Sequence, residues 1–337
     1  MPSIYAANDA ACYEMSMGRW SRRLAVPFIK FAGAGDKLQS VLDVGCGTGS
    51  LAFALGNAAQ QAKITGFDYS QAFVDYARSH TDDDRFSFDQ GDAVALPYAT
   101  GSFDAAMSML VLNFLSEPDK AVQEMVRVTR PGGVVAAAVW DFFGGHTFSR
   151  ILLDTAAPLD PGAGALRAKH CSPLTHPGEL AAMWKSVSLR EVEQAEITIR
   201  MVFNSFADLW EPWLGGQGTL GAYLLGLTGD KRQLIEHHTR LAYLAGGTDG
   251  PRSMASIADW GCIVAQPIDP KPPALQTDAA SSAVTNPAIG AKTRGCSTPR
   301  SSIRRRSGHI GHLLSLLDCW RPPVAAMAPW HYRALRA

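Results

Sequence analysis

The chain has 337 residues, of which 47% are hydrophobic and 18% charged, and its formal net charge at pH 7 is zero. This composition excludes a fully disordered or fibrous chain, and the length suffices for a sizeable buried core. The longest purely apolar run, 134–140, is far shorter than the ~20 residues that a membrane span needs. We therefore expect a globular protein without a membrane partner.

Charge distribution and cysteine usage narrow the functional classes further. Residues 267–337 contain ten Lys and Arg against three Asp and Glu, which leaves residues 1–266 mildly acidic. An acidic body argues against a nucleic-acid partner. The six cysteines form no CxxC pair, so no metal site is expected. The first residues lack a basic stretch followed by an apolar one, so we expect a cytoplasmic protein with reduced thiols.

The hydrophobic pattern predicts alternating helices and strands over the first 140 residues. Helices are expected over 13–35, disturbed at Pro27, and over 50–60, 71–79 and 119–128. Short strands are expected over 40–44, 63–67, 85–88, 102–109 and 134–140. Alternation at this spacing indicates parallel strands joined by right-handed crossovers, and hence an open α/β sheet.

The alternation stops after Asp141. Residues 142–185 are expected to be mostly helical or loop, 205–245 helical, and 193–203 and 253–264 strands. From Pro267 the chain is rich in Pro, Ser, Thr and Ala and lacks periodicity. Such a segment cannot bury enough apolar surface to offset its ordering entropy, so we predict a disordered tail.

The strongest local signal is the segment VLDVGCGTGS, in which a predicted strand runs into Gly45, Gly47 and Gly49 and then into a helix. Glycine is needed where the backbone takes a positive φ or approaches a ligand without a Cβ. Open α/β sheets bind ligands beyond the carboxyl ends of their strands, and this loop follows the carboxyl end of the first predicted strand. A Walker A loop would need a Gly-Lys pair, which is absent here. A dinucleotide fingerprint would need Gly or Ala where Ser50 stands.

The loop also fits the pattern Asp-x-Gly-x-Gly-x-Gly, which begins at Asp43. Here the sequence resembles the class I S-adenosylmethionine-dependent methyltransferases, in particular the type 11 domain of the ubiquinone and menaquinone biosynthesis enzymes. The resemblance continues in order through ITGFDYS at 64–70, the segment 91–115, and RVTRPGGVVAAAVW at 127–140. It covers residues 13–141 well and the next part of the chain loosely.

The resemblance implies a Rossmann-like, doubly wound, mostly parallel seven-stranded sheet with helices on both faces and a helical lid insertion. Residues 1–35 would form N-terminal helices that cover the cofactor. Residues 36–266 would form the methyltransferase domain, within which 142–250 is the substrate lid region. Residues 267–337 would be the low-complexity tail.

The resemblance also implies a site for S-adenosylmethionine. Asp68 would accept hydrogen bonds from the two ribose hydroxyls, and Asp92 from the adenine amino group. Tyr13 and Trp20 would lie over the sulfonium, although aromatic residues at helical spacing are as often a packing face. Arg19 would pair with the cofactor carboxylate. The expected cofactor-binding residues are Asp43, Gly45, Cys46, Gly47, Gly49, Asp68, Tyr69, Asp92, Ala93, Leu110, Tyr13 and Trp20.

The implied reaction is methyl transfer to a small-molecule acceptor by in-line displacement, in which the protein mainly aligns the acceptor and excludes water. A base is needed only for an acceptor that arrives protonated, and His146 after the fifth strand is the catalytic candidate. A lone His in a loop is more often structural. An NAD-dependent oxidoreductase and a non-catalytic cofactor-binding module are the alternatives. The sequence does not indicate the oligomeric state.

Overall fold

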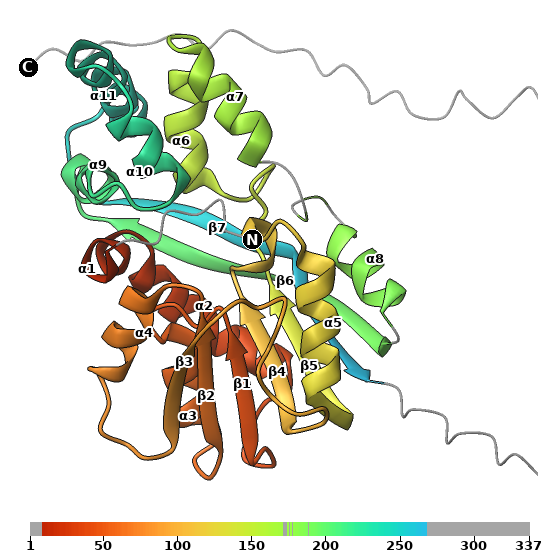
Figure 1. Ribbon diagram of the computed structural model, residues 1–337. Helices are drawn as coiled ribbons and strands as arrows, with labels where there is room; N and C mark the ends of the chain where they lie inside the picture. The colour runs from red at the N-terminus through yellow and green to blue at the C-terminus, as the bar shows by residue number, and fades with distance from the viewer. Residues whose placement is uncertain (1–8, 171–173, 175, 177, 188, 268–337) are drawn as a thin grey trace, which may run out of the picture. The chain divides into compact units, whose positions relative to one another are not determined.

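The computed structural model describes residues 9–170, 174, 176, 178–187 and 189–267. A sheet with the strand order β3-β2-β1-β4-β5-β7-β6 runs through them (Figure 1). The strands are β1 (Ser40–Val44), β2 (Lys63–Asp68), β3 (Phe86–Gln90), β4 (Phe103–Met109), β5 (Thr129–Ala138), β6 (Leu189–Phe203) and β7 (Arg252–Pro267). The first five are parallel, and β7 pairs antiparallel with both β5 and β6. The five parallel strands confirm the predicted Rossmann-like α/β class.

Helices cover both faces of the parallel strands. The α-helices of the described residues are α1 (Ala10–Tyr13), α2 (Arg19–Phe31), α3 (Ser50–Ala58), α4 (Gln71–Arg78), α5 (Pro118–Val128), α6 (Thr147–Ala156), α7 (Pro161–His170), α8 (Glu179–Ser186), α9 (Phe206–Leu214), α10 (Gly218–Leu225) and α11 (Gly229–Leu244). Successive strand residues point to opposite faces. Accordingly Val41 packs with α2, α3 and α4, whereas Leu42 and Val44 pack with α5 and α8. None of these helices is both long and apolar enough to cross a membrane.

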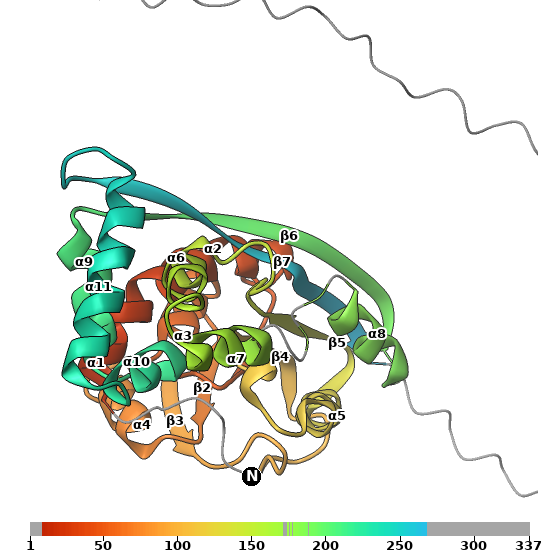
Figure 2. The same ribbon diagram turned by 90° about the horizontal axis from the view of Figure 1, so that it is seen from above.

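The order of the strands determines where a ligand can bind. The first strand, β1, lies between β2 and β4, so the chain reverses its direction of progress across the sheet at the β1–β4 pair. A crevice opens at such a switch point, beyond the carboxyl ends of the strands. Seen from two directions, helices α6, α7, α9, α10 and α11 form a layer on that side of the sheet (Figures 1 and 2). The long strands β6 and β7 connect this layer to the sheet.

Two aspartates join elements of the helical layer, one to other helices of this layer and one to the N-terminal helix α2. Asp160, just before α7, accepts hydrogen bonds from Tyr223 Oη at 3.0 Å and Lys231 Nζ at 2.7 Å. It thereby joins α7 to α10 and α11. Arg19 at the start of α2 donates to Asp208 Oδ1 in α9 at 2.7 Å. The predicted contact of Arg19 with a cofactor carboxylate is therefore replaced by an ion pair between elements.

Two predicted boundaries differ from the structure. The predicted N-terminal helix is interrupted by a π-helical turn, Glu14–Gly18. Pro27, where a disturbance was predicted, lies inside α2 and does not end it. The segment RPGG, 130–133, was expected to separate a helix from a strand that starts at Val134, but β5 already begins at Thr129. The register shifts there, because only Asp104 lies opposite those four residues. Such a bulge tolerates a proline, which has no N–H to donate.

The predicted tail, 267–337, lies outside the described residues except for Pro267, which ends β7.

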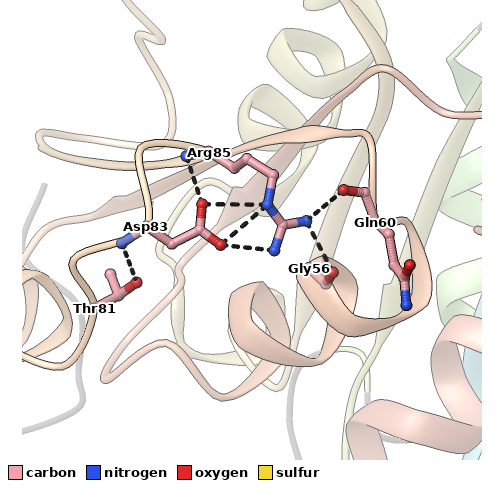
Figure 3. Close-up of polar contacts among 5 residues, drawn as sticks. All are labelled: Gly56, Gln60, Thr81, Asp83 and Arg85. Atoms are coloured by element: carbon pink, nitrogen blue, oxygen red, sulfur yellow. Dashed lines mark hydrogen bonds and ion pairs between the residues drawn. The ribbon is translucent and has the colours of Figure 1, made fainter.

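Arg85 binds the carboxyl end of α3 (Figure 3). Its guanidinium donates to the carbonyl oxygens of Gly56 at 3.1 Å and Gln60 at 2.9 Å, and Asp83 accepts from the same guanidinium at 2.7 to 3.2 Å. The last carbonyls of a helix have no intrahelical donor, and a cation there also compensates the helix dipole. This contact joins the end of α3 to the start of β3.

We expect Arg85→Ala to lower the free energy of unfolding by about 1 kcal/mol, because two carbonyl oxygens lose their protein donor in a partly exposed place. Urea denaturation measures this change. Arg85→Lys is the matched control: it keeps the charge but lacks the fork that reaches both carbonyls, so it should recover only part of the loss. Equal stability of Arg85→Ala and the wild type would show that the contact contributes nothing.

Candidate active site

The turn after β1 has a shape that requires glycine. The backbone N–H groups of Gly45 and Cys46 both donate to the carbonyl oxygen of Phe67, at 2.7 and 3.1 Å. All three glycines of the loop have positive φ, between +53° and +92°. A Cβ on Gly45 would lie 2.3 Å from the side chain of Val111. Conformation and space therefore both exclude a side chain here, and the backbone is left open to a ligand.

Asp68 at the end of β2 joins the glycine loop to the turn that follows β2. Its Oδ2 accepts a hydrogen bond from the N–H of Gly47, and its Oδ1 one from the N–H of Ser70, both at 2.8 Å. Burial raises the pKa of the carboxyl, and the backbone donors lower it in part. Each carboxylate oxygen can accept a second hydrogen bond. The carboxylate is thus oriented by the protein and keeps lone pairs that can accept from a ligand.

Asp43 lies behind the loop, in β1, and is 0% exposed. Neither carboxylate oxygen makes a hydrogen bond of normal geometry to another described residue. Burial, followed by the charge of Asp68, raises the pKa of Asp43 to about 8, whereas the nearby N–H of Ala52 lowers it slightly. At neutral pH this side chain is therefore mostly a neutral acid that supports the loop from inside.

A cavity of about 410 Å³ opens at the carboxyl ends of the parallel strands. Nine of the thirteen predicted site residues line it: Tyr13, Gly45, Gly47, Asp68, Tyr69, Asp92, Ala93, Leu110 and His146. Asp43, Cys46, Gly49 and Trp20 are not part of the lining. Cys46 is turned towards Gly66 inside the fold, and burial raises the pKa of its thiol well above the usual value. A buried neutral thiol of this kind is inert.

The two aromatic residues predicted to cover the cofactor lie in different places, one at the cavity and one in the core. Tyr13 lines the cavity, with its ring 5.1 Å from that of Phe73 and its hydroxyl 3.2 Å from Ser21 Oγ. Trp20 is 2% exposed and packs edge-on against Phe203 at 5.3 Å, so it is a core residue. The π-helical turn lies between the two, and its wider winding rotates the following residues away from the face that an α-helix would give them.

Leu110 follows β4 with φ at +66°, a left-handed conformation that costs a non-glycine residue about 1–2 kcal/mol. Its N–H donates to the carbonyl oxygen of Ala138 at 2.7 Å, which holds the backbone in place. The next residue, Val111, is the one that contacts Gly45. Strained backbone of this kind is concentrated at ligand sites. Here it joins the floor of the cavity to the glycine loop.

The rest of the cavity wall is largely apolar and comes mostly from two parts of the chain, residues 114–149 and 213–220. Its aromatic and aliphatic side chains include Phe114, Leu115, Trp140, Phe142, Phe148, Trp213 and Leu220. His146 is 2% exposed, and its Nδ1 lies 2.5 Å from Ser149 Oγ. Ser149, Gln217 and Thr219 also line the cavity and were missed by the sequence analysis. For Ser149 the available signal was its place one helical turn after His146, and the other two had none.

Comparison with known proteins gives a family match for the part of the chain that contains the glycine loop. Residues 42–137 match the family described as "Methyltransferase domain". This segment therefore resembles a methyltransferase domain. It contains the glycine loop, Asp68, Asp92 and Leu110, which are the residues that the sequence predicted to bind a cofactor. Within the described residues, no group of three His, Cys, Asp or Glu side chains is arranged to hold a metal ion.

The relatives that this part of the chain matches are themselves named as methyltransferases. The chain is 37% identical over 140 residues to a demethylmenaquinone methyltransferase of Renibacterium salmoninarum, covering 41% of this chain and 54% of that protein. It is 35% identical over 143 residues to a ubiquinone/menaquinone biosynthesis C-methyltransferase of Bdellovibrio bacteriovorus, covering 40% and 58%. The chain thus spans little more than half the length of these two relatives.

A solved structure is also similar. It is a Haemonchus contortus phosphoethanolamine N-methyltransferase 2 in complex with S-adenosyl-L-methionine, with a TM-score of 0.47 and 16% identity. The alignment covers 77% of this chain and 57% of that one.

Proposed function

We propose that the protein is an S-adenosylmethionine-dependent methyltransferase that transfers a methyl group to a small-molecule acceptor by in-line displacement. The observation that carries the proposal is the pairing of the glycine loop with the Asp68 carboxylate, inside the segment that matches a methyltransferase domain. S-Adenosylmethionine supplies an electrophilic methyl group when bound. The protein has to orient the cofactor and the acceptor and to exclude water.

Different cavity residues fit the ribose, the adenine and the methionine parts of this cofactor. Asp68, oriented by the N–H groups of Gly47 and Ser70, would bind the two ribose hydroxyls through its remaining lone pairs. Asp92, which follows β3 and accepts from the N–H of Val94 at 3.2 Å, would bind the adenine amino group, with Ala93 beside the ring. The methionine part would lie along the bare backbone of Gly45.

Other predicted residues would lie next to the ribose, next to the sulfonium and in or beside the glycine loop. Tyr69, next to Asp68, would cover one side of the ribose. Leu110 would form the floor under the sulfonium, and Tyr13 would lie over it, where a cation–π contact is worth about 0.5–2 kcal/mol. Asp43, Cys46 and Gly49 would contribute to cofactor binding indirectly, because they maintain the shape of the glycine loop.

The domain organisation is part of the same proposal. Residues 1–35 would cover the cofactor, and 142–250 would form a lid that supplies the acceptor side of the cavity through α6, α9 and α10. His146 would contact the acceptor or take its proton. A cytoplasmic location and an acceptor that is not a nucleic acid complete the proposal.

Calorimetric titration of the full chain tests the proposal. S-Adenosylmethionine and S-adenosylhomocysteine should bind with dissociation constants in the micromolar range, about −8 kcal/mol, since adenine, ribose and methionine each find complementary groups. NADH serves as the comparison ligand and should not bind. Binding of NADH without binding of S-adenosylmethionine would instead establish the oxidoreductase alternative. Tight cofactor binding without methyl transfer to any acceptor in a broad screen would favour the non-catalytic module.

A further inference from the structure

A buried polar pair lies within the aromatic part of the cavity. Ser149 and His146 are 3% and 2% exposed, and both line the cavity. The rings of Trp140, Phe142 and Phe148 lie 5.0, 4.9 and 5.5 Å from the imidazole. In a pocket walled by apolar groups, a few polar groups fix the orientation of the ligand. This pair is therefore placed to orient whatever binds against the aromatic wall.

The hydrogen-bonding capacity of Ser149 indicates which ligand group would suit it. If Ser149 Oγ donates to His146 Nδ1, it keeps lone pairs that can accept a hydrogen bond. If the imidazole donates instead, the serine proton is available to the ligand. A ligand hydroxyl satisfies Ser149 in both cases, because it is a donor and an acceptor at once. A group that only donates or only accepts would fit one of the two states.

The charges around the cavity indicate an uncharged acceptor. Among the described residues that line the cavity there is no Lys or Arg, and the lining carboxylates are Asp68 and Asp92. Arg19, the residue of the N-terminal segment that was predicted to pair with the cofactor carboxylate, is engaged by Asp208. An anionic ligand buried here would lose its hydration and meet like charges, with no cationic side chain among the described lining residues to compensate it. The cavity should therefore reject carboxylated or phosphorylated acceptors.

We propose that Ser149, held in place by His146, binds the hydroxyl group of a flat, uncharged acceptor that lies against the aromatic wall of the cavity. Ser149 contacts this hydroxyl, and His146 orients Ser149 in addition to its own proposed contact with the acceptor. This rests on the proposed function, because it assigns the acceptor half of the same cavity.

A purely local role for the pair makes different predictions. His146 precedes α6, and the N–H of Ser149 donates to the His146 carbonyl oxygen at 3.0 Å, so the two residues also shape the start of that helix. If this were their whole role, removing the serine hydroxyl would change stability and leave ligand preference untouched. A test must therefore compare ligands that differ by one hydroxyl.

The experiment uses the full chain saturated with S-adenosylhomocysteine and three two-ring probes of similar shape. They are 2-naphthol, 2-methylnaphthalene, which lacks the hydroxyl, and 2-naphthoate, which is an anion. We expect 2-naphthol to bind about tenfold more tightly than 2-methylnaphthalene, as one well-placed buried hydrogen bond allows. We expect 2-naphthoate to bind at least about 100-fold more weakly than 2-naphthol, owing to its uncompensated charge.

Ser149→Ala should abolish most of the preference for 2-naphthol and leave the affinity for 2-methylnaphthalene unchanged. His146→Gln is a second variant and should reduce the same preference, because Ser149 loses the partner that holds it. Thr155→Ala is the matched control: it removes a hydroxyl that donates to the Ile151 carbonyl on the same helix, away from the cavity lining. It should keep the full preference.

Three results would overturn the proposal: equal affinities of 2-naphthol and 2-methylnaphthalene in the wild type, unchanged preference in Ser149→Ala, or 2-naphthoate binding as tightly as 2-naphthol. Failure of all three probes to bind would overturn it too, since an apolar cavity of this kind should accept at least the neutral ones. Failure of S-adenosylhomocysteine to bind in the first step would be a separate result, directed against the proposed function.

Discussion

Replacing Asp68 by alanine should lower the affinity for S-adenosylmethionine by more than about 100-fold. Two effects act together. The ribose hydroxyls lose a carboxylate, and a hydrogen bond to a charged group is worth about 1.5–3 kcal/mol. The N–H of Gly47 also loses its acceptor at 2.8 Å, so the glycine loop is no longer held in its binding shape. A tenfold change in affinity corresponds to about 1.4 kcal/mol, so the two effects exceed a factor of 100.

Titration calorimetry of Asp68→Ala against the wild type measures this loss. Asp89→Ala is the matched control, because Asp89 is a carboxylate in the adjacent strand β3 that binds the Tyr98 hydroxyl at 2.9 Å and does not line the cavity. It should bind the cofactor as the wild type does. A fall of less than about fivefold in a folded Asp68→Ala protein would show that Asp68 does not carry the ribose contact.

The second large effect is a dependence of stability on pH that originates at Asp43. Burial and the charge of Asp68 raise its pKa in the folded protein to about 8, against about 3.9 for an unfolded aspartate. Between these two values the folded state keeps a proton that the unfolded state releases. The contribution of Asp43 to stability is therefore fully present below pH about 4 and is lost as the pH rises through about 8, by up to about 1.4 kcal/mol per pH unit.

Asp43→Asn, which has nearly the same shape and no charge, should remove this slope. Urea unfolding at several pH values between 5 and 9 measures it for both proteins. The difference between the two free energies of unfolding is the informative quantity, because the other titrating groups cancel in it. The variant should gain on the wild type as the pH rises towards about 8, and the gain should level off above that pH. Parallel stability curves for the two proteins would mean that Asp43 titrates normally in the folded state.

The parallel half of the fold was predictable because its signals are local. An apolar run of five or six residues followed by a glycine turn and a helix specifies one βα unit, and its repetition implies a parallel sheet. The same local logic located Asp68, since a residue that ends β2 lies beside the turn that ends β1 in any parallel pair. The boundaries at 13–35 and at 130–133 were wrong in detail. A π-helical turn and a bulge depend on contacts made by the neighbouring elements.

The sequence by itself thus determined the strand and helix order, the glycine loop and the acidic residue opposite it, because each follows from spacing along a short stretch of chain. Only the tertiary structure decided which aromatic residue faces the cavity and which cations remain available. Trp20 became core and Arg19 was engaged by Asp208, 189 positions away. The acceptor side likewise brings together Ser149 and Thr219 from distant helices. Such contacts depend on how helices pack against one another, and no periodicity in the sequence encodes that packing.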